Sequence, residues 1–341
     1  MKAEFGIRLP VSGPLASPDG IARIAKEAES YGFDSICVHD HLVIDREARY
    51  HFSAGLAESV DDRQEKGLSV TDFYEATTTL AYAAGLTKRV KLGPSAFVLP
   101  WRHPVLFAKQ SATLQELSCG RFTPALCIGR YPAGFEATNL PFKERGRIFD
   151  EALELLKLLL SSDKEVLFNG RYFKCRIDPI CPRPVDLPLW IGGGHNRIVY
   201  RRVARYCRGF LASGTPEQFE RSKAGIAEEM RRQERSEHDF RMGRQTFLCL
   251  KPSVEEARGL VDQTLHMFYH APQFNQIRDQ MIEETLQTSL IGDPGHVVKA
   301  IDEYLRAGVV FSEMRLIGVR DLNEATAMME LFADQVAPSF R

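Results

Sequence analysis

Short β-branched and aromatic runs alternate along the chain with longer segments whose apolar residues recur at helical spacing. The first of these runs is "EFGIRL" at 4–9, and it precedes a segment at 19–31 whose apolar residues share one helical face. Asp19 is the expected N-cap of that helix, since its carboxylate can accept the first free backbone amides. Such alternation is typical of parallel βα units, in which each helix packs on the sheet beside its strand.

The pattern predicts eight strands and eight principal helices. The strands are expected at 4–9, 35–41, 89–100, 121–129, 187–194, 209–214, 244–250 and 313–319. The helices are expected at 19–31, 72–86, 104–117, 143–160, 196–207, 216–232, 295–307 and 323–336. An α/β fold of the (β/α)8 TIM-barrel type is therefore the leading prediction. A doubly wound open sheet is the alternative, and it is disfavoured because no strand is followed by GxGxxG.

Three excursions interrupt the repeat, after strands two, four and seven. Residues 45–70 are rich in charge and glycine and are expected to form a lid. Residues 162–186 contain Asn169-Gly170 between two β-favouring runs, which predicts a hairpin. Residues 252–293 hold at least one helix that the pattern does not place. We expect residues 1–341 to form a single barrel domain that carries these three insertions.

Charge and cysteine content narrow the classes of partner and compartment. Acidic and basic residues nearly cancel, 45 against 44, and no long run of one sign occurs, which argues against nucleic acid or an anionic membrane as partner. The N-terminal sequence lacks the signal-peptide pattern, and no uninterrupted stretch of about eighteen apolar residues occurs. The seven cysteines are scattered and never spaced as CxxC, which favours reduced thiols. We expect a cytoplasmic protein that acts on a small molecule.

Three titratable residues, His39, Asp40 and His41, end the second predicted strand. In a barrel the C-terminal ends of the strands form one rim, where barrel enzymes hold their active sites. A histidine can donate or accept a proton near neutral pH, and an adjacent carboxylate raises its pKa and fixes its tautomer. His41 is therefore the candidate acid or base, with Asp40 as its partner. The alternative is a structural cluster that caps the strand end.

The spacing HxH also suits a metal site, which makes a metal-dependent hydrolase a further alternative. His195 is the one additional candidate ligand near a later strand end. Fewer than three plausible ligands do not make a catalytic zinc site, so no metal ligand is assigned. A serine nucleophile is disfavoured as well, because the chain contains no GxSxG elbow.

A glycine run at 192–194 stands just before a predicted helix, with Arg197 in or near its first turn. Backbone N–H groups at a helix N-terminus, the helix dipole and a guanidinium together form an anion site. The next strand ends in "LASGT", which can add the Ser213 hydroxyl and the Gly214 amide. We predict a phosphate site here, and a simple strand-to-helix turn is the alternative.

Several stretches resemble the luciferase-like superfamily of flavin- and deazaflavin-dependent oxidoreductases: "FGIRLP", "YGFDSICVHDHL", "NLPFKERGRIFDE", and "PLWIGGG" with "GFLASGT". The resemblance extends over roughly residues 4–215, in the family's order, and "IGDPGHVVKAIDEYLRAGV" extends it towards the last strand. It implies a (β/α)8 barrel, usually a homodimer, that binds FMN or coenzyme F420 at the rim with the phosphate near strands five and six.

The same resemblance implies positions for the cofactor. It places Gly193, Gly194, Ser213 and Gly214 at the phosphate, and Asp40 and His41 near the ring. It also implies a bulge in strand three, often with a non-proline cis peptide, that supports one face of the ring. In this chain the bulge is expected at Ser95-Ala96.

One departure from the family pattern follows strand four, where the chain reads "GRYPAG". The F420-dependent sugar-phosphate dehydrogenases carry glutamate and asparagine in the corresponding stretch, so that activity is disfavoured. Arg130 and Tyr131 occupy that position instead, and Gly129 and Arg130 are expected at the cofactor. Arg130 and Tyr131 could bind an anionic tail or substrate, or close the rim.

We therefore predict a two-electron oxidoreductase in which reduced F420 or FMN passes hydride to a small organic substrate or oxygenates it, with His41 and Asp40 as acid–base pair. F420 is preferred, because "HDHL", "PWRHP" and "PFKERG" look more like the F420-using branch. An FMN-dependent monooxygenase of the luciferase type is the main alternative, since reduced FMN can also activate oxygen. A non-catalytic barrel that binds flavin or another phosphate ligand is a further one.

Overall fold

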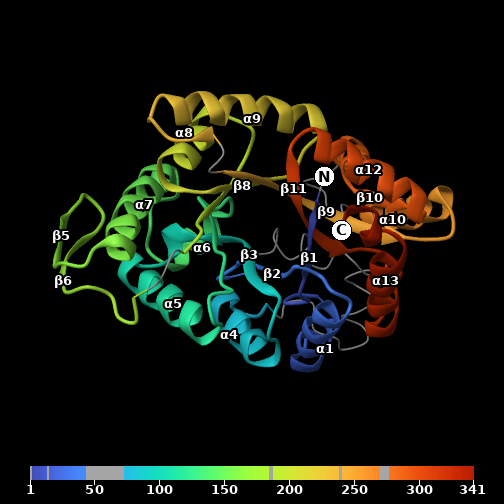
Figure 1. Cartoon of the computed structure of the whole chain (residues 1–341), viewed down its shortest axis with the longest axis horizontal. Helices are drawn as coiled ribbons and strands as arrows, with labels where there is room; N and C mark the ends of the chain where they lie inside the picture. Colours follow the sequence, from blue (N-terminus) through green and yellow to red (C-terminus); the bar gives the residue numbers. More distant parts are fainter. Residues whose placement is uncertain (1, 14, 44–72, 184–186, 238–239, 269–275) are drawn as a thin grey trace.

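The computed structural model describes residues 2–13, 15–43, 73–183, 187–237, 240–268 and 276–341. Eight parallel strands form a closed barrel, because β8 pairs with β9 and so joins the two ends of the row (Figure 1). The strand order around the barrel is β11-β1-β2-β3-β4-β7-β8-β9. Their bounds are β1 Glu4–Arg8, β2 Ser35–His39, β3 Lys91–Val98, β4 Ala125–Cys127, β7 Trp190–Gly192, β8 Gly209–Ala212, β9 Arg241–Leu250 and β11 Val309–Leu316. The predicted (β/α)8 fold is confirmed.

A ring of helices surrounds these strands (Figure 1). Its members are α1 Pro18–Ser30, α4 Ala76–Leu86, α5 Pro104–Leu117, α7 Arg145–Ser161, α8 Arg197–Tyr206, α9 Pro216–Arg231, α12 Pro294–Arg306 and α13 Leu322–Gln335. The strands are buried on both faces, as in β2, where all five residues are buried. None of the helices in the described ranges has both the length and the apolar character that a membrane crossing needs.

The start of α1 corrects one prediction. The N-cap is Ser17, whose hydroxyl oxygen accepts from the Gly20 amide at 2.9 Å, whereas Asp19 lies inside the first turn. Pro18 occupies the first helical position, where its missing N–H costs nothing, and it moves the helix start ahead of Asp19. Asp19 still favours the helix through its charge near the positive end of the dipole.

The predicted hairpin is present between β5 (Val166–Asn169) and β6 (Lys174–Ile177), but its turn differs from the expected one. Asn169 pairs with Lys174, so the loop contains the four residues 170–173 and not an Asn-Gly turn. The carboxylate of Glu151 on α7 accepts the backbone amides of residues 171–173 at 2.7–2.9 Å. A contact from a distant helix therefore decides the turn.

The insertion after β9 contains more structure than the pattern predicted. It holds α10 (Val254–Phe268), α11 (Arg278–Thr288) and a short strand β10 (Leu290–Gly292), which pairs in parallel with β9 outside the barrel. A second unpredicted helix, α6 (Pro132–Ala137), follows β4. The expected lid at 45–70 lies outside the described residues.

Glycines on neighbouring strands make room for two large rings inside the barrel. A Cβ atom at Gly209 would lie 2.0 Å from the Trp190 ring, and one at Gly243 would lie 2.8 Å from Phe311. The rings of Trp190 and Phe311 meet edge to face with centroids 6.0 Å apart. Both rings lie inside the barrel, near the starts of β7 and β11.

Candidate active site

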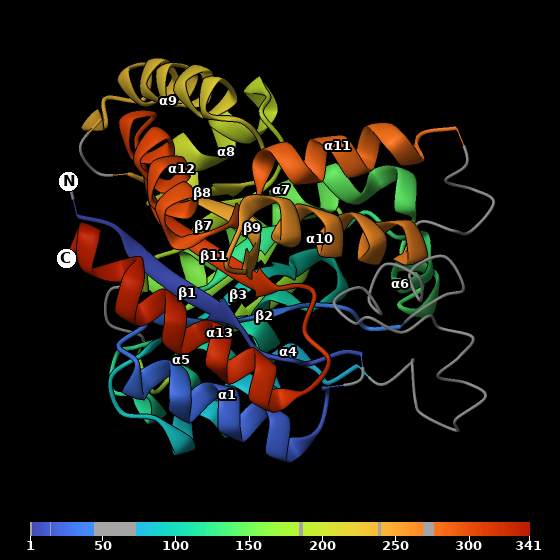
Figure 2. The same cartoon turned by 90° about the vertical axis from the view of Figure 1, so that its right-hand side faces the viewer.

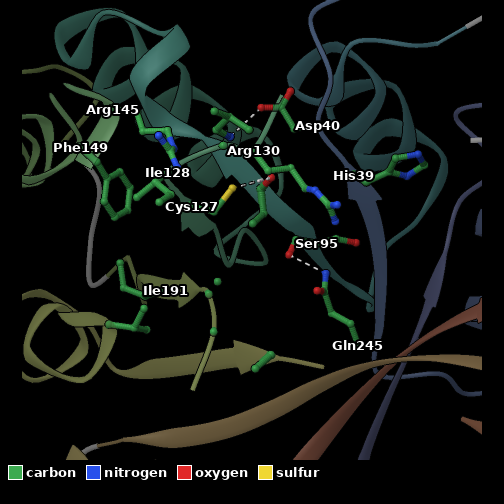
Figure 3. Close-up of a pocket in the computed structure, with 18 of the residues that line it drawn as sticks. His39, Asp40, Ser95, Cys127, Ile128, Arg130, Arg145, Phe149, Ile191 and Gln245 are labelled. Atoms are coloured by element: carbon green, nitrogen blue, oxygen red, sulfur yellow. Dashed lines mark hydrogen bonds between the residues drawn. The ribbon is translucent and has the colours of Figure 1, made fainter. Parts of the chain in front are cut away.

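A cavity of about 730 Å³ opens at the C-terminal ends of the barrel strands (Figure 3). Nine of the eleven predicted site residues line it, and the two exceptions are Arg197 and Gly214. The nine are Asp40, His41, Ser95, Ala96, Gly129, Arg130, Gly193, Gly194 and Ser213. The ends of β2, β3, β4, β7 and β8 thus converge on one space, which is of the size that organic ligands and cofactors occupy.

The predicted bulge is present in β3. Val38 of β2 pairs with Pro94, but the next residue, His39, pairs with Ala96, so Ser95 is the extra residue. The amide of Gln245 on β9 donates to the Ser95 carbonyl at 3.0 Å (Figure 3). The Ser95 hydroxyl donates to Glu313 at 2.6 Å. The Ser95–Ala96 peptide is trans, so the expected cis bond is not found there.

Glu313 connects this bulge to Arg8, which was not among the predicted site residues. Its carboxylate is fully buried and accepts from the Arg8 Nε at 2.5 Å as well as from Ser95. Arg8 ends β1 and lines the cavity. The signal in the sequence was a charged residue within the apolar run "FGIRLP".

Asp40 has a different partner from the predicted one. Its carboxylate accepts from both terminal nitrogens of Arg102, at 2.5 and 2.8 Å, and from the Val98 amide at 2.8 Å. Burial raises the pKa of Asp40, and the Arg102 guanidinium counteracts this by favouring the ionised form. The proposed pairing of Asp40 with His41 is therefore wrong, because both carboxylate oxygens hold the end of β3 and the segment after it.

Arg102 also contacts Glu75, the N-cap of α4, at 2.9 Å. The Glu75 carboxylate accepts the Thr78 amide at 2.7 Å. Partial burial raises the pKa of Glu75, but the backbone amides and Arg102 outweigh it and lower the pKa from 4.5 to about 2. The ionised carboxylate thus stabilises the folded state.

We expect Glu75→Gln to lower the free energy of unfolding by about 1 kcal/mol at pH 7, the usual size of a lost helix cap. Because the folded-state pKa is depressed, this difference from wild type is full above about pH 4.5 and fades as the pH falls towards about 2. Chemical denaturation of both proteins at pH 7 and pH 3 measures it. Glu220→Gln, at an exposed position of α9, is the control. An equal loss at both pH values would contradict the assigned ionisation.

His41 and His39 lie in different surroundings. The His41 ring is half-buried at the cavity and contacts the rings of Phe73 and Tyr131, with centroids 5.1 and 5.2 Å away. His39 is buried, and its Nε2 lies 3.1 Å from the Ser12 hydroxyl. Burial, and then the cation of Arg8, lower the pKa of His39 well below its usual range, so this ring stays neutral.

The glycine run and the start of α8 are arranged differently from the predicted anion site. Gly193 donates its amide to the Leu211 carbonyl at 3.0 Å, and the Asn196 side chain caps the first amides of α8. Arg197 points to α9 and pairs with Glu229 at 2.8 Å, with its side chain 62% exposed. Its assignment to the cofactor is therefore contradicted, because the α9 carboxylate draws the guanidinium away from the cavity. Gly193, Gly194 and Asn196 still line the cavity.

A hydrogen-bond network holds the turn after β8. His195 donates from Nε2 to the Ser213 carbonyl at 2.8 Å, and its Nδ1 lies 2.6 Å from the Ser222 hydroxyl. The Tyr304 hydroxyl donates to the Gly214 carbonyl at 2.8 Å. Gly214 has φ +150°, and an added Cβ would lie 2.4 Å from Gln218. His195 therefore positions this turn, and among the described residues no group of three His, Cys, Asp or Glu side chains suits a metal ion.

Four arginines line the cavity: Arg8, Arg130, Arg145 and Arg202. Arg202 is paired with Asp150 at 2.6 Å. Arg145 donates from Nη1 to the Phe142 carbonyl, while its Nε is buried and has no hydrogen-bond partner among the described residues. A buried donor of this kind fits an anionic ligand group. Arg145 lies within the stretch "NLPFKERGRIFDE" and was not among the predicted site residues.

Comparison with known proteins identifies the family. The model of the family described as luciferase-like monooxygenase matches residues 3–310. The chain therefore belongs to the luciferase-like monooxygenase family. A curated relative, the F420-dependent glucose-6-phosphate dehydrogenase of Gordonia bronchialis, is 26% identical over 219 residues, which are 62% of this chain and 58% of the relative.

Solved structures agree in fold. The coenzyme F420-dependent tetrahydromethanopterin reductase of Methanopyrus kandleri superposes with a TM-score of 0.74 at 22% identity and covers all of both chains. The oxygenating constituent of 3,6-diketocamphane monooxygenase of Pseudomonas putida, in complex with FMN, gives 0.74 at 16% identity and covers 100% of this chain and 99% of its own. Similar folds thus include F420-dependent and FMN-bound enzymes.

Proposed function

We propose that this protein is an oxidoreductase that binds reduced F420 or FMN in the 730 Å³ cavity and acts on a small organic substrate. The observation that carries the proposal is the convergence of the β2 end, the β3 bulge and the Ser213 turn on one cavity at the C-terminal rim. Membership in the luciferase-like family supports it.

The residues present fit such a cofactor. The bulged backbone at Ser95 and Ala96 would support one face of a planar ring. Gln245 binds the Ser95 carbonyl of that backbone, and Glu313 binds the Ser95 side chain. The Ser213 hydroxyl and the Gly194 backbone would hold a phosphate. When bound, the cofactor supplies the hydride, or in the case of FMN also the activation of oxygen.

His41 is the residue that we assign to proton transfer. Both histidines line the cavity, but the His39 ring is buried and held neutral, whereas the His41 ring is half-buried. The aromatic rings of Phe73, Trp101 and Tyr131 surround it, so water has limited access to its ring. Asp40 has a structural role, because its carboxylate binds the Val98 amide and Arg102 and so fixes the backbone that follows the bulge.

The arginines favour F420 over FMN. F420 has a longer tail with more negative charges than the single phosphate of FMN, and Arg130 and Arg145 offer cations along the wall. The Arg145 Nε donor has no hydrogen-bond partner among the described residues, whereas the Arg202 guanidinium is already paired with Asp150. An FMN-dependent monooxygenase remains the second candidate, because the phosphate groups of both cofactors suit the Ser213 turn.

Titration of the purified protein with F420 and with FMN, followed by fluorescence, tests the proposal. We expect F420 to bind more tightly, and Arg145→Ala to weaken its binding about tenfold or more, the scale of a lost hydrogen bond to a charged group. Arg197→Ala is the matched control and should change the affinity by less than about twofold, since its guanidinium faces Glu229.

Two results would contradict the proposal. Binding of neither cofactor would remove the assigned function. An equal loss of F420 affinity in Arg145→Ala and Arg197→Ala would show that the cavity arginines have no specific role in holding the tail.

A further inference from the structure

The N-terminal end of the barrel holds a second cavity, of about 840 Å³. It shares no lining residue with the candidate active site. Figure 2 shows the start of β1 and both chain termini on the left, and α6, which follows the rim of the active site, on the right. The second cavity therefore lies at the opposite end of the barrel.

The inner wall of this cavity is apolar. It is formed by Trp190, Leu211 and Phe311, together with Ala125. This apolar cluster contacts Ala96, which lines the active-site cavity, and so separates the two spaces. A volume of this size is in the range that bound organic molecules occupy in proteins.

The mouth of the cavity is basic. Among the described residues, Lys91, Arg235 and Arg241 line it, against one acidic lining residue, Glu4. Positive charge is therefore in excess along this wall, which attracts anions.

Glu4 is shared between two of these cations. Its carboxylate lies 3.2 Å from the Lys91 amine and 3.0 Å from the Arg241 guanidinium. Both basic side chains are about half exposed, 46% and 43%, so they can reach a ligand at the mouth. One carboxylate facing two cations leaves positive charge uncompensated.

We propose that this cavity binds an organic anion, with its charged group between Lys91 and Arg241 and its apolar body against Trp190. Contact with the apolar wall removes the apolar body from water, which favours binding. The excess of cations selects for negative charge. This site is independent of the proposed redox function.

Calorimetric titration with octanoate tests the proposal, with octan-1-ol as an uncharged probe of equal chain length. We expect octanoate to bind about tenfold more tightly than octan-1-ol, and its affinity to fall as salt is added. Equal affinities would show an apolar cavity without anion selectivity, and no binding at millimolar octanoate would show no site. Both results overturn the proposal.

Two variants with opposite expected effects on octanoate affinity test where octanoate binds. Lys91→Gln should lower its affinity about three- to tenfold, and Glu4→Gln should raise it by a similar factor, because Glu4 competes for the same cations. Arg145→Ala, in the other cavity, should have no effect. Loss of binding in Arg145→Ala without a change in Lys91→Gln would assign the octanoate to the active-site cavity and overturn the proposal. Thermal unfolding of each variant confirms that it is folded.

Discussion

Replacement of Arg102 by methionine is expected to lower the free energy of unfolding by about 3–5 kcal/mol, the cost of breaking a buried ion pair on one side. The Asp40 side chain is 1% exposed and would lose both of its charged hydrogen bonds, keeping only the Val98 amide. Chemical denaturation followed by tryptophan fluorescence measures the change. The geometry of the active-site cavity should also change, because Asp40 and Arg102 hold the backbone that follows the β3 bulge.

The loss of stability in Arg102→Met should become smaller as the pH falls. Burial already raises the pKa of Asp40, and loss of Arg102 removes the main influence that lowers it. The unpaired carboxylate is then neutralised as the pH falls through its raised folded-state pKa, so the deficit relative to wild type narrows at low pH. A double variant with Asp40→Asn should recover at least half of the loss at pH 7. A deficit of less than about 1 kcal/mol in Arg102→Met would show that the pair behaves as an exposed one.

Replacement of His41 by alanine is expected to slow turnover by about 100-fold or more, the usual scale for a general acid–base group, while cofactor affinity changes by less than about tenfold. This prediction depends on the proposed function. Steady-state kinetics with the reduced cofactor and a substrate found by screening small carbonyl compounds measure turnover, and fluorescence titration measures affinity. His296→Ala, at an exposed position of α12, is the control.

The outcome distinguishes two roles for His41. Unchanged turnover would remove it from the chemistry. A large loss of cofactor affinity with unchanged turnover would assign it to packing among Phe73, Trp101 and Tyr131. The pH–rate profile adds an independent readout, because a group with the pKa of a histidine should be missing from the profile of His41→Ala.

Most of the fold followed from local signals. The eight barrel strands are short runs of apolar and β-branched residues bounded by turn residues, and each is followed by a segment of helical period. The exceptions are the elements with weak local signals. Strand β10 has only three residues, which is too short to show a periodic pattern of apolar positions. The conformation of the hairpin turn depends on hydrogen bonds to Glu151.

The candidate site was predicted in part. Strand ends meet at one rim in any parallel barrel, so the convergence of Asp40, Ser95 and Ser213 followed from the fold. The errors concern pairing. The Asp40 carboxylate is bound by the Val98 amide and by Arg102, which lies 62 residues further along the chain, and no local pattern marks that partner.

Local periodicity and turn residues in the sequence account for the order of the elements, the barrel that they form and the strand ends that carry polar groups. The tertiary structure alone decided which charges meet. Three ion pairs join parts of the chain that are far apart in the sequence or lie on different elements: Arg102–Asp40, Arg8–Glu313 and Arg197–Glu229. A hydrogen bond forms only within about 3 Å and at a suitable angle, and such distances are set by the closed barrel and its packed helices, not by any local pattern.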